Sequence, residues 1–305
     1  MAEIGLGLAA LGRPAYINLG RDLPADRSVA AMRARAHEVL DAAYARGVRY
    51  LDAARSYGRS EEFLGGWLTT RPDVTDVTVG SKWGYTYTAN WQLDAEVHEV
   101  KDHSVATFER QLAETRALLG RWLDLYQIHS VTPDSPALTD GALHQRLAEL
   151  GAEGVRIGLS TSGPRQADAI RAALGVKVDG RPLFRAVQAT WNPLEPSAGD
   201  ALAEAHDAGC LVIVKEGLAN GRLAVDPPAA VAEIGAEVDA APDAVVLAAA
   251  LRQPWVDIVL SGASSVAQLD SNLAAAGVAL DPDLLRGLAE PPAEYWQRRS
   301  ALGWS

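Results

Sequence analysis

Short apolar runs alternate with longer segments of helical periodicity along most of this chain. Strand-like runs are predicted at residues 4–10, 48–52, 78–82, 123–128, 155–160, 186–190, 211–215 and 258–260. Helical segments with apolar residues every three or four positions are predicted at 30–46, 60–70, 104–119, 141–150, 164–174, 199–208, 242–252 and 266–275. Strands that alternate with helices predict a parallel sheet, and eight such units favour a closed (β/α)8 barrel. An open doubly wound sheet with a second domain is the competing architecture. No linker divides the chain, so we expect one domain over residues 1–305.

One motif near the start of the chain points elsewhere. The run Gly5-Leu6-Gly7-Leu8-Ala9-Ala10 matches the glycine fingerprint of dinucleotide-binding folds. That fingerprint requires a complete strand before it and a helix after it, because the glycines form the turn between the two. Here only four residues precede it, and Gly12 and Pro14 follow. We therefore interpret the match as fortuitous.

Composition narrows the class of protein. Lys and Arg number 28 against 39 Asp and Glu, so the net charge is −11 and gives no electrostatic footprint for nucleic acid. The single cysteine, Cys210, excludes an internal disulfide and a cysteine-based metal cluster. The six histidines show no metal-ligand spacing, which makes a metal-dependent hydrolase a poor hypothesis. No apolar run has the length of a membrane span and no signal peptide begins the chain, so a cytoplasmic location is expected.

Four ionisable side chains follow predicted strands: Asp52, Tyr57, Lys82 and His129. The carboxyl ends of barrel strands are where such proteins place their chemistry. A tyrosine is a weak acid at neutral pH, and a nearby ammonium such as Lys82 is expected to lower its pKa. Asp52 is expected to hold Lys82 by a salt bridge, and His129 to donate a hydrogen bond to a substrate oxygen. Together they suit a reaction in which a carbonyl oxygen becomes an alkoxide and takes a proton from Tyr57.

These residues carry a family resemblance. The segments Leu51–Gly58, Gly80–Trp83 and Asp124–His129 are similar to the aspartate–tyrosine, lysine and histidine segments of the aldo-keto reductases. Residues 157–161, 187–193 and 261–272 resemble further family segments. The resemblance implies a (β/α)8 barrel, a nicotinamide cofactor across its mouth and metal-free hydride transfer to an aldehyde or ketone. It implies that Tyr57 is the proton donor, that Lys82 and Asp52 tune it, and that His129 orients the carbonyl.

The same resemblance implies the positions of the cofactor contacts. Ser160 and Gln188 match positions that hold the nicotinamide carboxamide, and Thr161 stands where many members have asparagine. Lys215 stands where many members stack an aromatic ring on the nicotinamide. The remaining contacts are expected after the seventh strand, at Gly217, Leu218, Asn220 and Arg222, and at the adenosine end, at Gly262, Ser264, Ser265, Gln268 and Asn272.

The resemblance makes NADPH the expected cofactor, with NADH as an alternative. Members that prefer NADPH often place basic residues near the adenosine 2′-phosphate, whereas Gln268 stands where an arginine is common. An unpaired phosphate gains little without a cation, so the choice between the two cofactors stays open at this point.

Aromatic residues in the long connection from residue 83 to 103, after the predicted strand 186–190 and in the tail are candidates for the wall of an apolar substrate pocket. They are Trp83, Tyr85, Tyr87, Trp91 and Trp191, with Trp296 and Trp304 near the carboxyl terminus. Two functional hypotheses follow. The first is an NAD(P)H-dependent carbonyl reductase, whose partner is a small-molecule substrate. The second, motivated by Lys215, is a cofactor-binding redox sensor or partner-binding protein on the same fold with little turnover.

Overall fold

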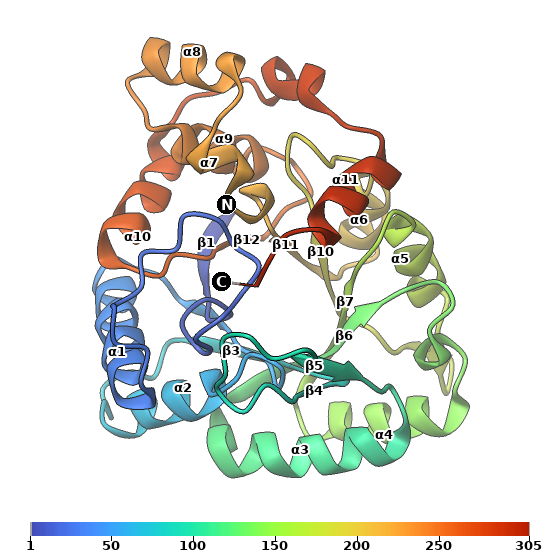
Figure 1. Cartoon of the computed structure of the whole chain (residues 1–305). Helices are drawn as coiled ribbons and strands as arrows, with labels where there is room; N and C mark the ends of the chain where they lie inside the picture. Colours follow the sequence, from blue (N-terminus) through green and yellow to red (C-terminus); the bar gives the residue numbers. More distant parts are fainter. Residues whose placement is uncertain (1, 305) are drawn as a thin grey trace.

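The computed structural model describes residues 2–304, and its centre is a closed barrel of eight parallel strands (Figure 1). The strands close in the order β1-β12-β11-β10-β7-β6-β3-β2. Their bounds are β1 Glu3–Gly7, β2 Tyr50–Asp52, β3 Thr78–Trp83, β6 Leu123–Val131, β7 Arg156–Thr161, β10 Ala186–Thr190, β11 Leu211–Lys215 and β12 Ile258–Ser261. The predicted (β/α)8 barrel is confirmed. Gly5 and Gly7 lie inside β1 itself, so they do not form the turn that a dinucleotide fingerprint requires.

A ring of helices surrounds the barrel, as Figure 1 shows. Its members are α1 Val29–Ala45, α2 Ser60–Thr69, α3 Val105–Leu119, α4 Gly141–Ala152, α5 Gln166–Leu174, α6 Gly199–Asp207, α9 Pro242–Leu251 and α10 Val266–Leu273. Predicted helix bounds agree with these to within two residues. The reason is local, since side chains such as Ser104 and Ser265 cap their helices by accepting a backbone N–H.

The long connections contain structure that periodicity did not predict. Residues between Trp83 and His103 form an antiparallel hairpin of β4 (Tyr85–Tyr87) and β5 (Glu99–Lys101). Residues after β11 form the helices α7 (Arg222–Val225) and α8 (Ala229–Val238). The tail forms α11 (Pro292–Ser300), and the described residues after it run back across the front of the barrel in Figure 1. A second, minor hairpin pairs β8 (Lys177–Val178) with β9 (Arg181–Pro182), and short 3-10 turns complete the chain.

The barrel interior is filled by side chains below the mouth. Tyr50, Leu125, Ile213 and Leu260 belong to one buried cluster inside the ring of strands. Gly80 makes room for the largest of them, because a Cβ there would lie 2.4 Å from the Tyr50 hydroxyl. The barrel is therefore a packed core and not a pore, and ligands are confined to the mouth where the strands end.

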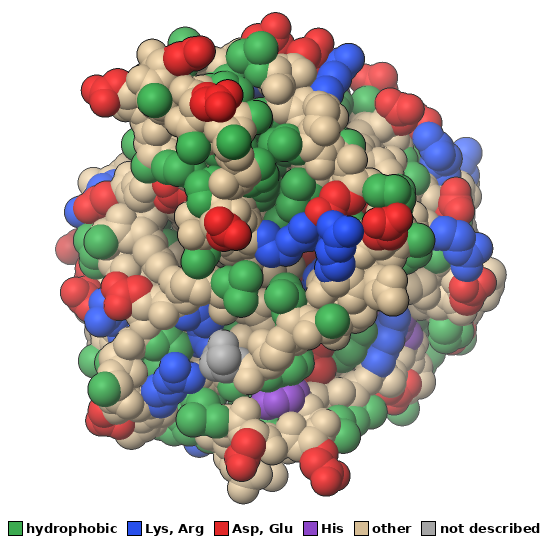
Figure 2. Space-filling model, turned by 45° about the horizontal axis from the view of Figure 1, so that its top comes forward, with side chains coloured by type: hydrophobic (Ala, Val, Ile, Leu, Met, Phe, Trp, Pro, Cys, Tyr) green, Lys and Arg blue, Asp and Glu red, His purple; other side chains and the backbone are tan. Residues whose placement is uncertain are grey.

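Charged side chains of both signs lie on the face of the molecule that Figure 2 draws. Acidic and basic side chains are interspersed over the face shown in Figure 2, so the excess negative charge forms no single large patch there. Among residues 2–304, no helix is long and apolar enough to cross a membrane. Within the same range, no group of three or more His, Cys, Asp or Glu side chains is placed to hold a metal ion.

Candidate active site

A cavity of about 660 Å³ opens at the carboxyl-terminal end of the barrel strands. Asp52, Tyr57 and His129 line it together with Gln188 and Lys215. These five residues come from β2 and its following loop, β6, β10 and β11, so the closed sheet brings them to one mouth. This is the position expected for the reaction centre of a (β/α)8 barrel.

A buried ion pair lies at the floor of the cavity. The Lys82 ammonium donates to the Asp52 carboxylate and, over 3.1 Å, to the carbonyl oxygen of Ala53. Lys82 is 0% exposed and Asp52 is 1% exposed. The amide of Gln188 and the hydroxyl of Tyr50 also donate to Asp52, at 3.0 and 3.3 Å. Such charges persist without water only because each is paired and further hydrogen-bonded.

Tyr57 and His129 lie directly beside this pair. The Lys82 Nζ is 4.8 Å from the centre of the Tyr57 ring, and the rings of Tyr57 and His129 meet edge to face at 5.5 Å. The His129 Nδ1 is 3.3 Å from the hydroxyl of Ser56. When Nδ1 accepts from Ser56, the neutral ring carries its proton on Nε2, which leaves that N–H for a ligand. All four residues predicted for catalysis are thus in one cluster.

The pKa directions of the cluster follow from its burial. Burial, with the Lys82 and Lys215 charges, holds the pKa of His129 well below its usual range, so the ring is neutral at neutral pH. Burial lowers the pKa of Lys82 although Asp52 acts in the opposite direction. Burial and the Asp52 carboxylate raise the pKa of Tyr57 well above 10. The expectation that Lys82 lowers the pKa of Tyr57 is therefore wrong, because burial and the Asp52 carboxylate act in the opposite direction and Asp52 neutralises the ammonium.

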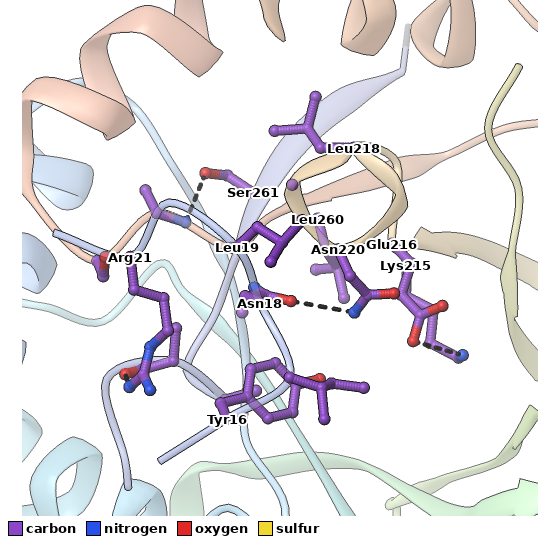
Figure 3. A pocket seen from close by; sticks show the side chains of 18 of the residues that line it. Tyr16, Asn18, Leu19, Arg21, Lys215, Glu216, Leu218, Asn220, Leu260 and Ser261 are labelled. Atoms are coloured by element: carbon purple, nitrogen blue, oxygen red, sulfur yellow. Dashed lines mark hydrogen bonds and ion pairs between the residues drawn. The ribbon is translucent and has the colours of Figure 1, made fainter. Parts of the chain in front are cut away.

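A second ionic cluster lies at the end of β11. Lys215 donates to the Thr190 hydroxyl at 2.8 Å and lies 3.8 Å from Glu216, as Figure 3 shows for the ion pair. Arg299 of α11 makes a two-pronged contact with Glu216, with distances of 2.5 to 3.0 Å. Burial lowers the pKa of Lys215 to about 8. Burial opposes ionisation of Glu216, but Arg299 and Lys215 prevail and lower its pKa to about 2.

Most of the predicted cofactor contacts line the same cavity. They are Gln188, Lys215, Gly217, Leu218, Asn220, Gly262, Ser264, Gln268 and Asn272. The Oε1 of Gln188 and the Oδ1 of Asn220 are buried and have no hydrogen-bond partner in the described part of the chain. Buried acceptors without donors are costly, so both atoms fit a ligand that brings N–H or O–H groups. The donor set is thus compatible with a nicotinamide dinucleotide.

The other four predicted contacts have structural partners instead. The Ser160 hydroxyl accepts from the Ser130 backbone N–H at 2.8 Å, and Thr161 lies 3.4 Å from the amide of Gln166. Ser265 caps α10 by accepting from the Gln268 N–H. Arg222 pairs with Glu290 at 2.5 Å. These four side chains do not line the cavity, and their contacts with a cofactor stay a prediction.

At the far end of the cavity, a loop after β1 closes over the start of α10. The Gln268 amide donates to the Gly20 carbonyl at 2.7 Å and accepts from the Ser264 N–H at 2.9 Å. Arg21 comes from this loop, lines the cavity and donates to the carbonyl oxygen of Ala10 at 2.6 Å (Figure 3). The Arg21 guanidinium is thereby directed to carbonyl oxygens near the start of its own loop, and the α10 segment itself contains no cation.

Most of the aromatic residues that were predicted to form the substrate pocket lie outside the cavity. Trp83 is fully buried against the Phe108 ring at 5.1 Å, and Trp191 packs on Trp255 at 5.8 Å. The Trp91 indole donates to the Arg27 carbonyl at 2.7 Å. None of these three rings lines the cavity, and neither does Tyr87, whose hydroxyl accepts from the Trp91 N–H. These rings anchor connections to the barrel, and that corrects the expectation of a pocket wall.

Other residues surround the catalytic end in their place. Trp304 lines the cavity, whereas Tyr85 packs on the His129 ring at 5.2 Å without lining the cavity, so its place in the substrate pocket stays a prediction. Sequence reasoning missed the liners Arg13, Tyr16, Glu99, Ser130, Arg299 and Leu302. No motif marks them. Arg13 and Tyr16 lie in the loop after β1, Glu99 lies in the β4–β5 hairpin, and Arg299 and Leu302 lie in the tail, all segments whose positions depend on tertiary packing, whereas Ser130 directly follows His129 in β6. A signal was available only for the loop after the first strand, which contains three arginines, Arg13, Arg21 and Arg27.

Comparison with known proteins supports the family. The sequence profile of the aldo/keto reductase family matches residues 3–290. The chain belongs to this family. An aldo-keto reductase of Strobilurus tenacellus is 28% identical over 305 aligned positions, which cover 87% of this chain and 84% of the relative. An uncharacterized oxidoreductase of Mycobacterium tuberculosis is 31% identical, covering 80% and 78%. The chain is accordingly an oxidoreductase of the aldo/keto reductase family.

Solved structures agree on the fold. The holo form of an aldo-keto reductase from Bacillus halodurans has a TM-score of 0.69 at 23% identity, covering 95% of this chain and 92% of that one. An aldo-keto reductase from Klebsiella pneumoniae in complex with NADPH has a TM-score of 0.67 at 21% identity, covering 93% and 89%. The aldo/keto reductase barrel is thus common to all three chains.

Proposed function

We propose that this aldo/keto reductase reduces aldehydes or ketones to alcohols, with NADPH as its cofactor and Tyr57 as the proton donor. The observation that carries the proposal is the cluster of Tyr57, His129 and the Lys82–Asp52 pair at the mouth. An acid, a neutral hydrogen-bond donor and a fixed, paired cation lie in contact with one another. This set suits a carbonyl oxygen that gains negative charge and then a proton.

The chemistry divides among the residues as follows. A bound nicotinamide supplies the hydride to the carbonyl carbon. His129 donates a hydrogen bond to the carbonyl oxygen and so polarises it, and its depressed pKa keeps it a neutral donor. Tyr57 gives its proton to the developing alkoxide, and the adjacent Lys82 and Asp52 fix the position of the ring. In the oxidative direction Tyr57 is the base.

The coenzyme assignment rests on the cavity and on relatives. The Klebsiella pneumoniae structure holds NADPH. Within the described part of this chain, Gln188 and Asn220 offer unpartnered acceptors, and Arg21 adds a cation to the lining of the cavity. We therefore place the nicotinamide near Gln188 and the adenosine end near Gln268. NADH is the alternative, and a comparison of the two affinities separates them.

The test is consumption of NADPH or NADH, followed at 340 nm, with a panel of aliphatic, aromatic and sugar aldehydes. Tyr57→Phe is the control, because it removes one hydroxyl and keeps the ring. General acid catalysis contributes roughly 10²–10⁴-fold, so a loss of that size is expected. Full activity in the variant would exclude Tyr57 as the donor. Tight cofactor binding with no turnover on any carbonyl would favour the redox-sensor or partner-binding hypothesis.

A further inference from the structure

Arg13 is a buried cation beside the proposed proton donor. It lies in the loop after β1, lines the cavity and is only 2% exposed. Its guanidinium carbon is 5.3 Å from the centre of the Tyr57 ring. Its Nη1 donates to the carbonyl oxygen of Ser56 at 3.1 Å. Arg13 therefore contacts both the ring of Tyr57 and the backbone that carries it.

Aromatic rings shield this guanidinium from water. The Tyr16 and Trp304 rings lie 4.3 and 4.8 Å from it, and Trp304 in turn stacks on His98 at 4.1 Å. An arginine keeps its charge even when buried. Because the surroundings are poorly polarisable, its field at the Tyr57 hydroxyl is stronger than that of an exposed cation.

The loops of Arg13 and Tyr57 interlock through two glycines. The Arg59 N–H donates to the Gly12 carbonyl at 2.7 Å. A Cβ on Gly12 would lie 2.3 Å from the Tyr57 carbonyl oxygen, and Gly58 has a φ of +59°. Neither position accepts a larger residue without moving the loops. The backbone thus fixes Arg13 against Tyr57 independently of the Glu99 contact.

The charges around Tyr57 leave Arg13 as the effective cation. The titratable and charged groups that face Tyr57 are Asp52, Lys82, His129, Tyr16, Arg13 and Glu99. Lys82 is neutralised by Asp52, and His129 is neutral. Glu99 pairs with Arg13 at 3.1 Å and is a quarter exposed, so it offsets only part of the field. Burial and Asp52 raise the pKa of Tyr57, whereas Arg13 acts to lower it.

We propose that Arg13 is a positioning residue for Tyr57, which holds the ring in place and stabilises the phenolate that forms when the proton leaves. This inference rests on the proposed role of Tyr57 as proton donor. It adds a second cation to the lysine of the family pattern, from a loop that the pattern does not include. Arg13 does not contact the carbonyl itself in this account.

The test is a titration that needs no turnover. A ring-fluorinated tyrosine, which is a stronger acid, is placed at position 57, and its ionisation is followed by absorbance in the cofactor-free protein. Arg13→Met is expected to raise the pKa of that phenol by about one unit. Arg13→Lys keeps the charge and is expected to restore about half of the shift. Glu99→Gln removes the opposing carboxylate and is expected to lower the pKa by about half a unit.

The opposite signs of the pKa changes in Arg13→Met and Glu99→Gln distinguish an electrostatic role of Arg13 from a general loosening of its loop. A merely structural role would shift the pKa in the same direction in both Arg13→Met and Glu99→Gln, and that result overturns the proposal. An unchanged pKa in Arg13→Met overturns it as well. The failure of the proposed function is seen elsewhere, as an absence of carbonyl reduction by the wild-type protein, and leaves the titration unaffected.

Discussion

Two ionic clusters face each other across the barrel mouth and differ in burial and in charge balance. β3 carries Lys82 and β11 carries Lys215, and these strands are four positions apart in the closed order of eight. Lys82 has a carboxylate partner of its own, Asp52, on the neighbouring strand. Lys215 shares Glu216 with Arg299, so that side has two cations for one carboxylate.

The difference indicates different tasks. The Asp52–Lys82 pair is electrically neutral, completely buried and next to Tyr57, which suits a rigid floor for proton transfer. The Glu216 cluster has an excess positive charge, is partly exposed and ties α11 to the end of β11. It suits a wall that binds and orders ligands more than one that transfers protons.

The largest loss of stability is expected for a variant of the electrically neutral Asp52–Lys82 pair. Asp52→Asn leaves the Lys82 ammonium buried without a partner, and breaking a buried pair costs roughly 3–5 kcal/mol. Urea denaturation should show that loss in the free energy of unfolding, together with loss of carbonyl reduction. The double variant Asp52→Asn/Lys82→Met should recover much of the stability and none of the activity. Unaltered stability in the single variant would contradict the picture of a dry ion pair.

A smaller loss is expected on the charged side. Glu216→Gln leaves Lys215 and Arg299 without their carboxylate, but their side chains are 14% and 23% exposed, so water compensates in part. We expect a cost of about 2 kcal/mol in urea denaturation. Because the folded pKa of Glu216 is about 2, below its ordinary 4.5, this stability is present above pH 4.5 and lost as pH falls toward 2. The Glu216→Gln variant should not show this loss of unfolding free energy between pH 4.5 and 2.

A smaller effect on stability is expected from Lys215 at alkaline pH. The folded pKa of Lys215 is about 8, below its ordinary 10.5, so the unfolded chain binds this proton more tightly. Stability from this group therefore rises with pH between about 8 and 10.5. Unfolding free energies of wild type and Lys215→Met, measured across that range, should differ by a term that grows by about 1–3 kcal/mol. A constant difference would show that Lys215 is not desolvated.

The smallest effects concern the aromatic rings. Trp304→Ala removes a ring that lines the cavity, and we expect the KM for carbonyl substrates to rise about fivefold, which corresponds to about 1 kcal/mol of lost apolar contact. Trp91→Phe is the matched control, because Trp91 packs on Phe63 outside the cavity. Steady-state kinetics of both variants on one aldehyde make the comparison. Equal changes of KM in the two variants would indicate that Trp91 also lines the substrate pocket.

The same contrast explains what could be predicted from sequence. Asp52, Tyr57, Lys82 and His129 follow strands whose apolar runs are plain in the sequence, and parallel strands end at one mouth, so their meeting was predictable. Arg13 and Arg299 reach the mouth through a loop and a terminal helix, whose positions depend on tertiary contacts such as Arg299 with Glu216. The aromatic residues of the 83–103 connection were misplaced because apolar surface alone does not distinguish a pocket wall from a loop anchor.

We propose above all that Tyr57, which lies beside the Asp52–Lys82 pair, donates the proton that completes carbonyl reduction. The most direct measurement is a single-turnover reaction in which protein saturated with NADPH is mixed with a reactive aldehyde and absorbance at 340 nm is followed. We predict that Tyr57→Phe binds NADPH as tightly as the wild type, as judged by quenching of tryptophan fluorescence, and transfers hydride at least about 100-fold more slowly. An unchanged single-turnover rate in Tyr57→Phe would contradict the claim.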